Sequence, residues 1–138
     1  INLPDKPMVR NAVTQFLLSE QKARKICVDG TREAGLAGLF LASLGGKIDA
    51  LILRYAPVSY LFDDREPVDF FSMGIHLPGI LKWGDVSLAA ALSGKDLTFV
   101  HPVTMSGQPV IGKELENFKL EFGRIRKICG MEGGTAFK

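Results

Sequence analysis

The sequence has few of the residues from which metal and redox sites are built. Its 138 residues include two histidines and two cysteines, and neither pair has a CxxC or HxxxH spacing. Because a structural or catalytic metal needs several closely spaced ligands, we expect no metal site and no cofactor. Cys27 lies in an apolar, strand-like segment and Cys129 at the end of a helical pattern. We therefore expect both to be buried packing residues rather than a disulfide.

Long apolar runs and an excess of one charge are also absent. No apolar segment approaches the ~18 residues that cross a bilayer, and the first residues, INLPDKPMVRN, lack the layout of a signal peptide. Any export signal would lie upstream of Ile1. The net charge of +2 comes from 17 basic and 15 acidic residues that are mixed along the chain, whereas a nucleic-acid surface clusters Lys and Arg. We expect neither a membrane nor a nucleic acid as partner.

The patterns that are present predict an α/β fold. Apolar residues recur at helical spacing over about 16 residues from Met8, over 35–44, after Asp85 and over 115–129, and apolar strand-like segments occupy 25–30, 48–55 and 96–102. Strands that alternate with helices predict a parallel sheet covered by helices on both faces. We expect one three-layer αβα domain over residues 1–138, with about three strands and a frayed tail after Cys129.

Three strands are few for a sheet whose strands are this apolar. Residues 25–30 need a neighbour at the sheet edge, so we expect either a second copy of the chain or a larger protein to supply it. Between the second and third strands, residues 56–79 lose all periodicity and gather prolines and aromatic residues. Excursions of this length carry function or cover a site. We expect His76, in this region, to be structural. We expect Trp83, which follows it, to be a core or interface anchor rather than a sugar-stacking platform.

The most informative stretch is ICVDGTREAGLAGLF, residues 26–40, which predicts a strand, a sharp turn and a buried helix. A nucleophile elbow of the form G-x-S-x-G has this outline, and its strain demands small residues two places before and after the nucleophile. Gly30 and Ala34 are those small residues, and Gly35 allows the helix to pack closely on the strand. The residue at the nucleophile position is Arg32.

A family resemblance rests on this turn together with two later stretches. The sequence resembles, in the order and spacing of these stretches, the second half of bacterial acetyl xylan esterase-like hydrolases related to dienelactone hydrolase. The stretches are GTREAGLAGL (30–39), IDALI (48–52) and HLPGILKWGD (76–85) followed by LAAAL (88–92). The resemblance covers residues 25–102. It implies a partial α/β-hydrolase fold, an ester hydrolase ancestry, a carbohydrate ester as ligand and a periplasmic or secreted location.

The same resemblance implies that the catalytic triad is degenerate. It places the nucleophile at Arg32, whose guanidinium stays protonated and cannot attack a carbonyl. It places the acid in the loop 103–109, VTMSGQP, which contains no carboxylate, and the base after a later strand, although no histidine follows His101. We therefore expect a non-catalytic C-terminal portion of an acetyl xylan esterase-like protein, whose partner is the missing N-terminal hydrolase portion or a second copy of the chain.

One alternative remains open from the residues alone. The chain could be a fragment of an active ester hydrolase with an unorthodox site, in which Glu33 or His101 acts as acid or base and Arg32 holds an anionic or carbonyl oxygen. The competing interpretation is that Arg32 and Glu33 form a local ion pair that closes the turn, and that His101 is a packing residue at a strand end.

Overall fold

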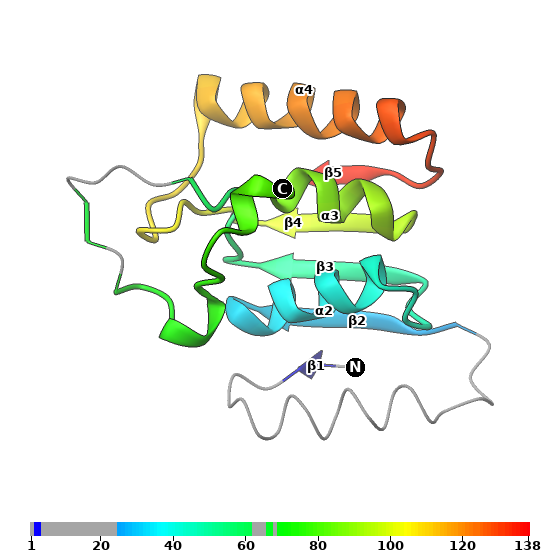
Figure 1. Cartoon of the computed structure of the whole chain (residues 1–138), viewed down its shortest axis with the longest axis horizontal. Helices are drawn as coiled ribbons and strands as arrows, with labels where there is room; N and C mark the ends of the chain where they lie inside the picture. Colours follow the sequence, from blue (N-terminus) through cyan, green and yellow to red (C-terminus); the bar gives the residue numbers. More distant parts are fainter. Residues whose placement is uncertain (1, 4–24, 62–65, 68) are drawn as a thin grey trace.

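The computed structural model describes residues 2–3, 25–61, 66–67 and 69–138. The helix predicted from Met8 lies outside these residues. Strands alternate with helices along the described chain (Figure 1). The elements are β1 (Asn2–Leu3), β2 (Cys27–Thr31), α2 (Glu33–Ser43), β3 (Ala50–Arg54), η1 (Met73–Ile75), η2 (Ile80–Lys82), α3 (Val86–Ser93), β4 (Asp96–Val100), α4 (Gly112–Cys129) and β5 (Thr135–Phe137).

The strands form one five-stranded sheet in the order β1-β2-β3-β4-β5, and every neighbouring pair is parallel. The three predicted strands are confirmed as β2, β3 and β4. The expectation that a second copy or a larger protein supplies the neighbour of residues 25–30 is wrong, because β1 of the same chain pairs with Asp29 and Gly30. The expectation of a frayed tail is wrong, because Thr135–Phe137 pairs with β4 over Leu97 to Phe99. The sequence pattern does not indicate this strand, because it has only three residues and directly follows two glycines. Its stability comes from pairing with β4.

Helix boundaries follow the capping residues. The Asp85 side chain accepts a hydrogen bond from the Val86 N–H and begins α3, as the sequence predicts. Gly94 ends α3 and Gly130 ends α4 in the left-handed conformation. None of the helices within the described ranges is long and apolar enough to cross a membrane.

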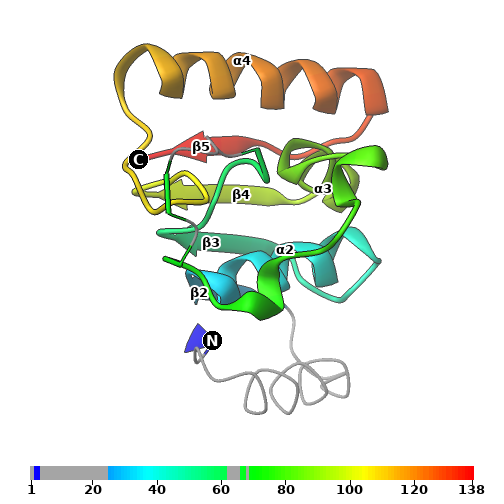
Figure 2. The same ribbon diagram turned by 60° about the vertical axis from the view of Figure 1, so that its left-hand side comes forward.

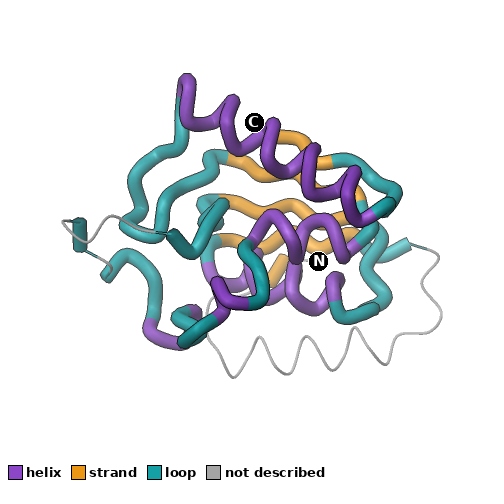
Figure 3. Tube along the Cα trace, turned by 45° about the horizontal axis from the view of Figure 1, so that its top comes forward, coloured by secondary structure: helices purple, strands orange, loops and turns teal. Residues whose placement is uncertain are grey.

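All three long helices, α2, α3 and α4, pack on the same face of the sheet, where α3 contacts both of the others (Figure 3). The strand order explains this arrangement. When successive right-handed crossovers step in one direction across a sheet, each connecting helix falls on the same side. The parallel α/β architecture is confirmed, but the described helices make up only one of the two helical layers expected from the sequence.

The opposite face of the sheet, which we call the open face, is uncovered by the described residues. Burial alternates along each central strand, so Val28, Leu51 and Leu97 are buried towards the helices whereas Asp29, Ile52 and Thr98 are half-buried. Cys27 also points to the open face and is exposed. The expectation that Cys27 is buried is therefore wrong, because an apolar strand run does not reveal which face lacks a cover. Cys129 is half-buried.

Aromatic packing joins α4 to the last two strands. The ring of Phe99 on β4 stacks on Phe137 of β5 at 5.2 Å between centroids, and Phe122 of α4 meets both rings edge-on at 5.5 and 5.3 Å. Phe122 belongs to the apolar stripe predicted for this helix. The cluster holds the edge strand β5 against the core. Figure 2 shows β5 between β4 and α4.

A buried arginine connects the same region. Arg126 donates hydrogen bonds to the backbone carbonyls of Ala90, Lys95 and Glu132, at 2.8 to 3.1 Å, and to the Thr135 hydroxyl at 3.2 Å. Burial lowers the pKa of the Arg126 guanidinium, and the Asp96 carboxylate partly opposes that effect. One side chain thus joins the end of α3, the start of β4 and the strand β5.

We expect Arg126→Ala to lower the free energy of unfolding by about 2–4 kcal/mol, because it leaves buried carbonyls without donors. Arg126→Lys recovers less than half of the loss, since a single ammonium cannot reach all four acceptors. Urea denaturation measures both. Lys127→Ala, at an exposed position one residue later, is the matched control and changes stability by less than about 0.5 kcal/mol. An Arg126→Ala protein as stable as this control would contradict the role assigned to Arg126.

Candidate functional site

Each of three adjacent strands is followed directly by a residue with an unusual backbone conformation. Arg32, Tyr55 and His101 follow β2, β3 and β4, and they have φ angles of 53°, 50° and 50°. The register pairs Thr31 with Arg54 and Arg54 with Val100, so the three residues lie in a row at the carboxyl edge of the sheet. Open α/β sheets bind ligands at this edge, and strained backbone is concentrated at functional sites.

Arg32 lies at the apex of the predicted turn. Its φ of 53° and ψ of −123° place it outside both helix and strand geometry, directly before α2. The neighbouring residues must be small: a Cβ added to Gly30 would lie 2.6 Å from the Cα of Gly35, and one added to Gly35 would lie 2.7 Å from the Gly30 carbonyl oxygen. The turn therefore has the backbone shape of a nucleophile elbow, with an arginine where the shape presents a side chain.

The Arg32 side chain is folded against the excursion between β3 and α3. Its guanidinium carbon lies 4.4 Å from the centre of the Phe70 ring and 5.7 Å from that of Phe71, and its Nη2 donates a hydrogen bond to the Phe70 carbonyl. Its Nε lies 3.7 Å from the Glu33 carboxylate. The predicted ion pair at the turn is present, and aromatic contacts hold the cation in place.

Glu33 and His101 do not contact each other directly. Glu33 is buried, and its Oε1 accepts a hydrogen bond from the Ser72 N–H at 2.8 Å. His101 is exposed and its ring stacks on Tyr55 at 5.3 Å between centroids. Because β3 lies between β2 and β4, the backbones of Arg32 and His101 are separated by about 10 Å, two strand spacings. The structure brings Arg32 and Glu33 together and leaves His101 with Tyr55.

The loop after β4 has no acidic group. Val103 pairs with Pro57 and with Pro109 through isolated bridges, and Met105 and Ser106 are buried within the loop. The strand that follows this loop and α4 is β5. The described residues contain no group of three or more His, Cys, Asp or Glu side chains that could hold a metal ion.

The open face carries one charged pair near this edge. The Arg54 guanidinium binds Asp29 with two nitrogen atoms, at 2.8 Å from Nε and 2.9 Å from Nη2. The hydrogen bond and the charge of Asp29 raise the pKa of Arg54. The sequence shows no signal for this pair, because the two residues are 25 positions apart and only the parallel register places them side by side.

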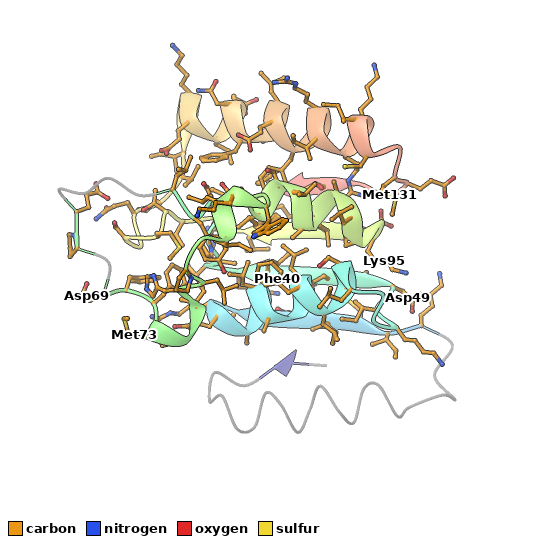
Figure 4. The ribbon with its side chains drawn as sticks, in the orientation of Figure 1. Phe40, Asp49, Asp69, Met73, Lys95 and Met131 are labelled. Atoms are coloured by element: carbon orange, nitrogen blue, oxygen red, sulfur yellow. The ribbon has the colours of Figure 1, made fainter. Side chains whose placement is uncertain are left out.

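A pocket of about 290 Å³ lies under the excursion, between η2 and the loop after β4. Its lining includes residues 76–81, Tyr60 and Met105. Within the described residues, the Tyr60 hydroxyl and the His76 Nε2 atom are both buried and have no hydrogen-bond partner. The excursion extends beyond the carboxyl ends of the strands, on the side where Figure 4 labels Asp69 and Met73. Asp49 and Lys95 are labelled at the opposite end of the strands.

Sequence reasoning expected His76 to be structural and assigned no role to Tyr60. Within the described residues, His76 Nε2 makes no hydrogen bond that would support a structural role. Tyr60 gave no periodic signal, because it lies in an irregular segment. Trp83 is 84% exposed, so it is not a core residue.

We expect Gly30→Ala and Gly35→Ala each to destabilise the fold by about 2–3 kcal/mol, because the added methyl group meets backbone atoms that cannot rotate away. Thermal and urea unfolding measure the loss. Gly123→Ala in α4 is the control: no atom lies within 4 Å of the added carbon, and removing a helical glycine stabilises by about 1 kcal/mol. Equal effects at positions 30, 35 and 123 would contradict the close backbone approach.

No family model and no curated protein matches the sequence. Among solved structures, the chain is similar to Pyrococcus horikoshii acylaminoacyl peptidase in an orthorhombic crystal form, with a TM-score of 0.52 and 16% sequence identity. The match covers 94% of this chain and 22% of that chain, so the present chain spans about a fifth of the length of this neighbour.

The acylaminoacyl peptidase is an α/β-hydrolase. An identity of 16% supports a likeness of fold and not of substrate. Together with the parallel sheet, the comparison shows that this chain has a fold similar to part of an α/β-hydrolase.

Proposed function

We propose that this domain is a non-catalytic portion of a larger acetyl xylan esterase-like protein, in which the former nucleophile turn has a structural role. The observation that supports it most directly is Arg32, which occupies the apex of the turn and is held there by Phe70, Phe71 and Glu33. A nucleophile at this apex must project freely towards a substrate. The Arg32 side chain instead binds the excursion that covers the turn.

The surroundings of Glu33 and His101 also favour a structural role. A general base needs a free lone pair within reach of the reacting proton. Glu33 is engaged by the Ser72 N–H and by Arg32, and the His101 ring lies on Tyr55. The alternative of an unorthodox ester hydrolase would need Arg32, Glu33 and His101 to act on one carbonyl group, across the intervening strand β3.

The open face supports the proposal that the domain belongs to a larger assembly. Half-buried apolar side chains such as Ile52 and Val100 lie on this face beside the Arg54–Asp29 pair. Parallel sheets built from strands as apolar as these are normally covered on both faces. We propose the N-terminal hydrolase portion as the cover, and a second copy of the chain as the competing occupant. The assignment to carbohydrate esters rests on the resemblance of residues 30–39, 48–52 and 76–92.

We expect the chain to show no hydrolysis of p-nitrophenyl acetate above the buffer rate, measured at 405 nm (roughly the absorbance maximum of p-nitrophenolate) over neutral to mildly alkaline pH. The physical reason is that no nucleophile lies at the apex of the turn. His101→Ala and Glu33→Gln are assayed beside the parent chain. Hydrolysis that is lost in His101→Ala or in Glu33→Gln would overturn the non-catalytic assignment and establish the unorthodox site.

The structural role of Arg32 has its own test. We expect Arg32→Ala to lower the free energy of unfolding by about 1–2 kcal/mol, because it removes the cation–π contact and the hydrogen bond to Phe70 from a site that is partly exposed. Amide hydrogen exchange at Ser72 should accelerate, since Glu33 and the excursion lose their anchor.

Two variants serve as controls for Arg32. Arg32→Gly also removes the side chain but relieves the positive φ, so it should be about 1 kcal/mol more stable than Arg32→Ala. Arg124→Ala removes an exposed arginine from α4 and should leave Ser72 exchange unchanged. If Arg32→Ala matches Arg124→Ala in both stability and exchange, Arg32 does not hold the excursion.

A further inference from the structure

We propose that the pocket lined by Tyr60, His76 and Met105 binds a small, uncharged, apolar molecule that carries one hydroxyl group, such as a phenol or a cyclic alcohol. This proposal does not depend on whether the strained turn is catalytic. It rests on the lining of the pocket and on two buried polar atoms that have no hydrogen-bond partner among the described residues.

The size and lining of the pocket define the apolar part of the ligand. Its volume of about 290 Å³ lies at the lower end of the ~300–1,000 Å³ range of ligand pockets, which suits a single ring rather than a sugar chain. Apart from Tyr60 and His76, the lining side chains are Leu77, Pro78, Ile80, Leu81 and Met105. Such a surface favours a hydrocarbon ring over a polyol.

Two polar atoms define the functional group of the ligand. Tyr60 is 6% exposed, yet its hydroxyl has no partner among the described residues, and the same holds for the buried Nε2 of His76. A buried polar group without a hydrogen bond costs about 1–3 kcal/mol. Both residues line this pocket. Because both atoms have almost no accessible surface, a ligand reaches them only when the lining side chains shift slightly, and it then recovers that cost.

A hydroxyl group is the simplest partner for this pair. The Tyr60 O–H can donate to the ligand oxygen, and the same ligand oxygen can donate its proton to His76 Nε2 or accept one from it. A hydroxyl therefore fits either tautomer of His76. A carbonyl oxygen only accepts, so it would satisfy one tautomer alone.

The charge around the pocket favours a neutral ligand. Asp85 lies next to Tyr60 and accepts a hydrogen bond from the Tyr60 N–H at 2.7 Å, as well as from the Ser59 hydroxyl and the Val86 N–H. Burial, together with the negative charge of Asp85, raises the pKa of Tyr60 to about 12. The burial and the negative charge of Asp85 that disfavour a tyrosinate also disfavour a carboxylate ligand beside the Tyr60 hydroxyl.

The experiment compares three probes that share one ring: p-cresol, toluene and 4-methylbenzoate. Each is titrated into the uniformly ¹⁵N-labelled chain and followed by amide chemical shifts. We expect p-cresol to bind roughly tenfold more tightly than toluene, because it pairs both buried polar atoms. The shifts should concentrate at residues 76–81, Tyr60 and Met105. We expect 4-methylbenzoate to bind more weakly than p-cresol.

Variants separate the polar pairing from simple filling of the pocket. Tyr60→Phe keeps the ring and removes the hydroxyl, so it should weaken p-cresol roughly tenfold and leave toluene unchanged. Tyr55→Phe alters the other tyrosine, which is exposed at the sheet edge, and should change neither probe. Should Tyr60→Phe fail to fold, the comparison of p-cresol with toluene on the unmodified chain still decides the question.

Each remaining outcome overturns the proposal. Equal affinities for p-cresol and toluene would show that the hydroxyl is not recognised. Tighter binding of 4-methylbenzoate would exclude a neutral ligand. Shifts located away from the pocket, or no binding by p-cresol at concentrations where it stays soluble, would show that this cavity is not a ligand site.

Discussion

The close approach of strand β2 to helix α2 constrains the whole carboxyl edge of the sheet. Gly30 and Gly35 bring two stretches of backbone so near that neither has space for a methyl group. This contact forces the chain to reverse within a few residues, and the reversal places Arg32 in a conformation that side chains rarely adopt. The position of Arg32, its contact with the excursion and the burial of Glu33 all follow from this backbone contact.

The parallel register extends that constraint across the sheet. Because β2, β3 and β4 end at the same level, Tyr55 and His101 take up strained positions beside Arg32. In a hydrolase, this edge gathers nucleophile, acid and base from separate strands. Here the edge carries an arginine held by aromatic rings and a histidine stacked on a tyrosine. The side chains of Arg32 and His101 make packing contacts at this edge.

The layers of the fold follow from the direction of the connections rather than from any single residue. Each crossover steps the same way along the sheet, so α2, α3 and α4 share a face, and the described residues leave the other face open. A sequence of alternating strands and helices is compatible with either one or two helical layers. For this reason the exposure of Cys27 and the Arg54–Asp29 pair could not be foreseen, whereas the strands themselves could.

The sequence by itself determined the local features: the three central strands, the small residues of the turn, the Asp85 cap and the apolar stripe of α4. These depend on neighbours within about one helical turn or one strand, and such patterns are readable along the chain. Only the tertiary structure decided the edge strand β5, the burial of Arg126 and the presence of Tyr60 and His76 in the lining of one pocket. Each of these joins residues that are distant in sequence, and their energies arise from burial, which no local pattern encodes.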